Sequence, residues 1–205
     1  MKPNKRAKDL MYLSKVVWDF RKEIEQRWAT PDPLNSLRYA FTECGEAMDE
    51  YLRMNRPGDS RNNERERSYE EELADVAIML FTAINPEWLR DYYEEYNIEY
   101  IWFDVIFPEN YRLETLCTHV SEAMMSAKND EDGESQVYLG WVFRAGLAIG
   151  WLYGNPDFDL ELQIKTKLEK IAAKHFPDFG YGNPAAIAFV KKAMPWATER
   201  RICKE

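Results

Sequence analysis

The sequence has few of the residues that build covalent or metal-rich frameworks. Its three cysteines, Cys44, Cys117 and Cys203, are scattered along 205 residues, and none stands in a CxxC pair. This spacing argues against both a disulfide framework and a structural zinc site. The two histidines have no glutamate at the ExxH spacing that di-iron carboxylate bundles use, so that class of protein is disfavoured.

Uninterrupted apolar stretches are also missing. The most apolar run, residues 137–154, carries Arg144 at its middle and several glycines, and it predicts a buried helix rather than a membrane span. The first residues lack the apolar core of a signal peptide. We therefore expect a cytoplasmic protein in a reducing compartment, with no membrane partner.

Basic residues are in the minority. Lysine and arginine number 27 against 36 acidic residues, which gives a formal net charge of −9. A protein that binds nucleic acid through the phosphate backbone is expected to be basic, so we expect no nucleic-acid partner. A nucleotide substrate stays open, because a bound cation can reverse the local sign of charge.

Strand-like alternation is scarce. It occurs only over residues 98–107, where a buried connector explains it equally well. Apolar periodicity and turn signals predict helices over residues 9–28, 34–54, 69–84, 86–97, 110–128, 136–153, 157–175 and 184–198. Residues 55–68 are expected to form a polar loop, with Ser68 as the N-cap of the next helix. The fold class is therefore all-α, a single compact helical bundle over residues 1–205.

A short repeat occurs within this helical pattern. The tripeptide EAM at residues 46–48 recurs at residues 122–124, each time in a predicted helix that precedes a polar loop and an apolar helix. The shared order indicates a pseudo-twofold internal repeat, and chance is the competing explanation for three matching residues.

A stripe of glutamates marks the second predicted helix. Glu43, Glu46 and Glu50 lie about one turn apart on one flank, where like charges repel. Ala40 and Ala47 lie between them and the core side, and would let a neighbouring helix or a ligand come close. The residues expected to face the core are Leu37, Phe41, Cys44, Met48 and Tyr51.

The third predicted helix places an acid among apolar residues. Asp75 is the only charged residue from Leu73 to Ile84, so the helix and its carboxylate are expected to be buried. Glu72 lies one turn earlier on the same side. A buried carboxylate is usually paired, protonated or bound to a metal.

Two explanations of these acids stay open. Glu43, Glu46, Glu72 and Asp75 offer oxygen ligands only, which suit a hard cation such as Mg²⁺ or Mn²⁺. Alternatively, Asp75 forms an ion pair with a buried arginine or lysine, for which the candidates are Arg38, Arg53 and Arg144.

The spacing resembles that of the all-α NTP pyrophosphatase superfamily, which contains the MazG-like proteins, the dimeric dUTPases and the phosphoribosyl-ATP pyrophosphohydrolases. Its signature is ExxE on one helix and ExxD on the next, matched here by ECGE at 43–46 and ELAD at 72–75. The match covers about residues 35–84, and the rest of the chain matches only in being helical. Many MazG-like sequences carry a further glutamate where this chain has Thr42.

The resemblance implies a Mg²⁺-dependent hydrolase, with Mn²⁺ as the other suitable ion. It would cleave nucleoside triphosphates between the α and β phosphates, giving a nucleoside monophosphate and pyrophosphate. The implied metal ligands are Glu43, Glu46, Glu72 and Asp75. The implied catalytic acids are Glu43, Glu46 and Glu50. The competing interpretation is a non-catalytic helical interaction module that retains a cation site.

Substrate contacts are expected from basic and aromatic side chains. Candidates for the phosphates and the base are Lys165, Arg144, Trp18 and Phe41, with Lys167 and Lys170 on the same predicted helix as Lys165. The lysines are explained equally by a solvated helix face, and the aromatic residues by the core.

The resemblance also divides the chain into halves. Residues 9–97 would be the active half, and residues 98–205 a degenerate second half in which His119 and Glu122 stand in the places of Glu43 and Glu46. Arg144 would then stand near the place of Asp75. Members of the superfamily usually dimerise, so a homodimer is expected as well.

Overall fold

The computed structural model describes residues 3–25, 32–54, 62–83, 113–129, 160–175 and 184–197. Its helices are α1 (Pro3–Glu25), α2 (Pro33–Met54), α3 (Asn62–Thr82), α6 (Leu113–Asn129), α8 (Leu160–His175) and α9 (Pro184–Ala193). These ranges contain no strand, which confirms the all-α prediction for the described part of the chain. None of the helices in them is both long enough and apolar enough to cross a membrane.

Each predicted helix that falls on described residues has a counterpart, but α1 starts at Pro3 instead of residue 9, and the start of α3 differs too. It begins at Asn62, so Ser68 lies inside the helix, and the predicted N-cap is wrong. The added first turns are rich in glutamate and arginine, which favour helix but give no apolar periodicity. The helices predicted at 86–97 and 136–153, and the strand-like segment 98–107, lie outside the described residues.

The start of α2 is fixed by local chemistry. The backbone N–H of Leu34 donates to Oδ1 of Asp32 at 3.2 Å, and the N–H of Ser36 donates to the Asp32 carbonyl at 2.9 Å. Asp32 is therefore the N-cap, and Pro33 occupies the first helical position, where a missing N–H costs nothing. This cap fixes where α2 begins.

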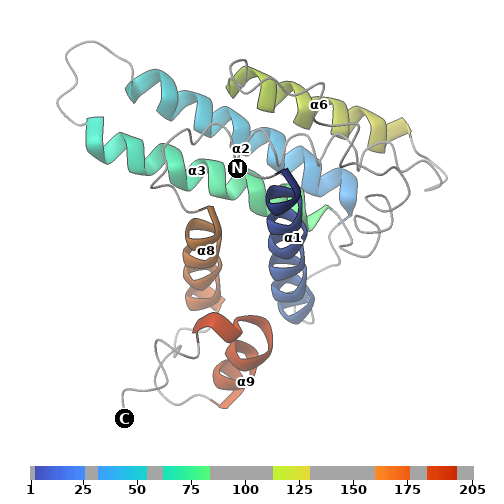
Figure 1. Cartoon of the computed structure of the whole chain (residues 1–205), viewed down its shortest axis with the longest axis vertical. Coiled ribbons are helices and arrows are strands. Elements are labelled where there is room, and N and C mark those ends of the chain that lie inside the picture. Colours follow the sequence, from blue (N-terminus) through green and yellow to red (C-terminus); the bar gives the residue numbers. More distant parts are fainter. Residues whose placement is uncertain are drawn as a thin grey trace.

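The long helices lie in two layers (Figure 1). α2 and α3 run antiparallel, side by side, and α6 packs along the other side of α2. α1 and α8 contact α3 and run across its direction, while α9 packs against α1. α2, α3 and α6 therefore form one layer, and α1 and α8 cross it on the side of α3.

The second half of α3 forms the centre of the core. Leu73, Val76, Ala77 and Leu80 are fully buried, as the sequence predicted for this helix. Burying one leucine of this kind contributes about 1.5–3 kcal/mol. The one buried hydroxyl at the end of α3, that of Thr82, donates to the Ile78 carbonyl at 2.8 Å and so loses no hydrogen bond.

The buried face of α2 is rotated from the predicted one. Its buried residues are Ser36, Leu37, Ala40, Cys44 and Ala47. Phe41 is 46% exposed and Tyr51 is 38% exposed, so their expected core positions are wrong. Small side chains at 40, 44 and 47 let α3 and α6 approach α2 closely, and the larger rings are turned outward.

The second layer is joined by aromatic and charged contacts. Phe20 of α1 and Phe189 of α9 meet edge to face, with ring centroids 5.6 Å apart. Nearby, Nζ of Lys192 lies 2.5 Å from Oε1 of Glu23. These contacts hold α9 against α1, away from the α2–α3 pair.

Candidate metal centre

The candidate centre lies where α2 and α3 face each other. Ala40 and Ala47 have no exposed surface, and Glu43 lies between them along the helix, at the edge of the packed face. Glu43 is therefore half-buried, whereas Glu46, one turn on, is exposed. Small residues beside Glu43 allow the acids of α3 to come near it.

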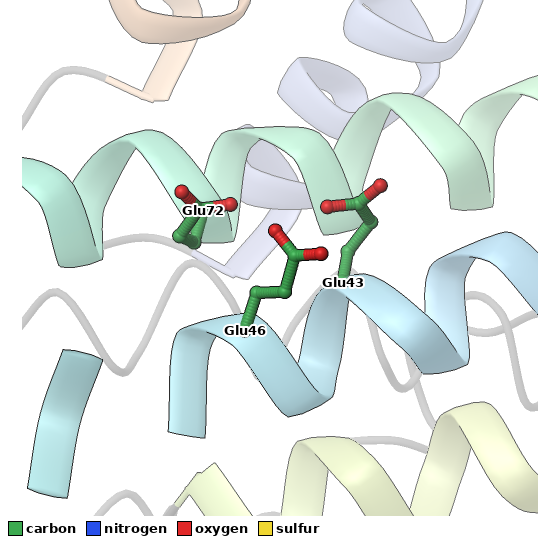
Figure 2. A group of neighbouring side chains, drawn as sticks. All are labelled: Glu43, Glu46 and Glu72. Carbon is green, nitrogen blue, oxygen red and sulfur yellow. The ribbon is translucent and has the colours of Figure 1, made fainter. Parts of the chain in front are cut away.

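Three carboxylates converge at this place. Glu43 and Glu46 point from α2 toward α3, where Glu72 meets them (Figure 2). One carboxylate oxygen from each of the three lies within 4.8 Å of the other two. Oxygen donors at this separation fit the coordination shell of a single hard cation, whose metal–oxygen bonds are about 2.0–2.6 Å long.

The crowding of like charge changes the acidity of these groups. Burial is the largest cause that raises the pKa of Glu43 from 4.5 to about 7, and the three neighbouring carboxylates act in the same direction. Burial also raises the pKa of Glu72, against the opposing charge of Lys167. Without a cation, the centre therefore retains protons that a solvated carboxylate would release.

Asp75 is held differently from the other three acids. Its Oδ2 lies 2.5 Å from Nζ of Lys167 on α8, and both side chains are mostly buried. Burial raises the pKa of Asp75, and the lysine opposes this without reversing it. Within the described residues, the expected four-carboxylate set is thus three converging acids and a fourth engaged in an ion pair.

The predicted alternative for Asp75, a buried basic partner, is confirmed, but the partner differs from the candidates. Arg38 donates to Oδ1 of Asn35 at 2.8 Å, and Arg53 pairs with Asp49 and with Glu50. Arg144 lies outside the described residues. The pairing of Lys167 with Asp75 could not be predicted, because α8 and α3 are far apart in the sequence and no local pattern links them.

Helix α8 supplies further counter-charge to α3. Burial lowers the pKa of Lys167, but the hydrogen bond and charge of Asp75 outweigh it, and the net pKa is raised. One turn along α8, Nζ of Lys170 donates to Oε1 of Glu71 at 2.9 Å. The only advance signal was the lysine spacing in residues 165–170, which equally fitted a solvated face.

Lys165, predicted to meet substrate, is occupied elsewhere. It pairs with Glu161 and donates to the Tyr12 hydroxyl at 3.1 Å. Its Nζ also lies 5.4 Å from the ring centroids of Tyr12 and of Trp196. Lys165 therefore joins α8 to α1 and to the end of the described chain, and contributes no contact to the acidic group.

The remaining predicted residues lie on α1 and α2. Glu50 lies on the same flank of α2 as Glu43, and Nη1 of Arg53 is 3.1 Å from its Oε1. Trp18 lies on α1, with Nζ of Lys22 at 5.8 Å from its ring. Phe41 projects from the exposed side of α2. The structure does not bring Trp18 or Phe41 into contact with the three converging carboxylates.

Comparisons of the chain with models of known families, with curated proteins and with solved structures found no match.

Proposed function

We propose that this protein is a Mg²⁺-dependent nucleoside triphosphate pyrophosphohydrolase, which cleaves (d)NTP between the α and β phosphates. The observation that carries the proposal is the convergence of Glu43, Glu46 and Glu72 from two antiparallel helices. The ExxE and ExxD spacings add to it, because they resemble those of the all-α NTP pyrophosphatases. Both features belong to the α2–α3 pair.

The residues present fit a hard divalent cation. All donors are carboxylate oxygens, and their mutual repulsion is relieved when a cation binds. Glu43, Glu46 and Glu72 would hold Mg²⁺, with Asp75 adjacent to them. Bound there, the ion supplies positive charge to the phosphate oxygens as the anhydride bond breaks.

In this proposal, protein side chains bind the phosphates and accept a proton from the attacking water. Lys167 lies beside the acids, since its ammonium pairs with Asp75 and its charge acts on Glu43, and it is the candidate to meet a phosphate there. Glu43, Glu46 and Glu50 are the candidates to accept the proton of the attacking water.

The test is product identification with a panel of NTPs and dNTPs and Mg²⁺ in H₂¹⁸O. We expect monophosphate and pyrophosphate, with the label in the monophosphate because water attacks the α phosphorus. Orthophosphate together with a nucleoside diphosphate would contradict the proposal. Asp75→Asn and Glu72→Gln are expected to abolish turnover and keep the helical circular dichroism. Glu114→Gln on α6, an exposed acid away from the centre, is the matched control.

The Asp75–Lys167 ion pair favours a second candidate, a helical module that binds a cation without catalysis. In that case the lysine neutralises Asp75 permanently. Tight Mg²⁺ or Mn²⁺ binding without turnover of any nucleotide in the panel would support this candidate against the first.

The burial pattern supports a repeated helix within the proposed bundle. Residues 46, 47 and 48 of α2 are exposed, buried and half-buried, and residues 122, 123 and 124 of α6 follow the same order. Glu43 and His119, at matching places, are both half-buried. We propose that α6 is the degenerate counterpart of α2, in which the acidic set is incomplete.

A further inference from the structure

We draw no further inference here: the strongest candidate, the surface patch that Phe41, Gly45 and Leu52 form on the exposed side of α2, carries none, because nothing in the described part of the structure shows what covers it.

Discussion

Glu43 and Asp75 are both partly buried acids on the α2–α3 pair, but their charges are compensated differently. Asp75 has the ammonium of Lys167 at 2.5 Å, whereas Glu43 has carboxylates for neighbours and a pKa raised to about 7. The first arrangement is an ion pair that stabilises the packing of α8. The second is a repulsion that the charge of Lys167 offsets only in part, and that a proton or a bound cation would relieve further.

This repulsion predicts a pH dependence of stability. Between about pH 4.5 and 7, folded Glu43 retains a proton that the unfolded chain releases, so the free energy of unfolding of the cation-free protein falls as pH rises. The loss is absent below this window and complete above it. Allowing for solvent screening of a half-exposed group, it amounts to on the order of 1 kcal/mol.

Urea unfolding in EDTA at about pH 5 and about pH 8 measures this loss of stability. Glu43→Gln should reduce the difference between the two conditions, and Glu114→Gln should leave it as in the parent. A parent protein that is equally stable at both values, or more stable at the higher one, would contradict the prediction.

The Asp75–Lys167 pair predicts a loss of stability on truncation. Lys167→Met leaves a mostly buried carboxylate without its partner, and we expect a loss of about 2 kcal/mol, below the roughly 3–5 kcal/mol of a fully buried pair. The double variant Asp75→Asn, Lys167→Met should recover most of it, as measured by a double-mutant cycle in chemical denaturation.

Lys170→Met is the comparison, because its pair with Glu71 is more exposed and should be worth less than about 1 kcal/mol. The geometry indicates that Asp75 depends on Lys167. Equal losses of stability in Lys167→Met and Lys170→Met would contradict this.

At the scale of elements, the acidic centre depends on how closely α2 and α3 pack. Ala47→Leu places a larger side chain at a position with no exposed surface, and we expect a destabilisation of about 1–3 kcal/mol in thermal or chemical unfolding. Phe41→Leu, on the exposed side of the same helix, should stay within about 0.5 kcal/mol of the parent. If Phe41→Leu destabilised the protein more than Ala47→Leu, the core face of α2 would be the one predicted from the sequence.

The elements also show what periodicity can predict. The burial of α3 from Leu73 onward followed from its apolar composition in every direction around the helix. The face of α2 was misjudged by about one residue, because its large apolar residues are turned outward and small ones form the contact. The start of α3 at Asn62 could not be predicted from periodicity, because its first turns are charged and contain no apolar residues that would mark a helix face.

At the scale of the molecule, the sequence predicted local acidic sets and not their partners. ExxE and ExxD each place two acids on one helix face by spacing alone. Lys167 comes from a helix whose position depends on tertiary packing, so no spacing in the sequence places it beside Asp75. The group of carboxylates could therefore be predicted from the sequence, and the ammonium beside it could not.

A cation at the centre predicts a stabilisation of the whole fold. If only the folded state binds Mg²⁺, an ion concentration of 100 times the Kd adds about 2.7 kcal/mol to the free energy of unfolding. Thermal unfolding with Mg²⁺ against NaCl at matched ionic strength measures this. Glu72→Gln should remove most of the effect, and Glu114→Gln should retain it. Equal unfolding temperatures in the two salts would contradict a folded-state site.

Helix α8 carries both Lys167, which binds Asp75, and Lys165, which lies over the indole of Trp196. An ion that draws Asp75 away from its ammonium would loosen one end of this link and alter the surroundings of that indole. If the proposed ion binds, this indole would therefore report its binding optically. Its emission should change on titration with Mg²⁺, and the response should be lost in Trp196→Phe.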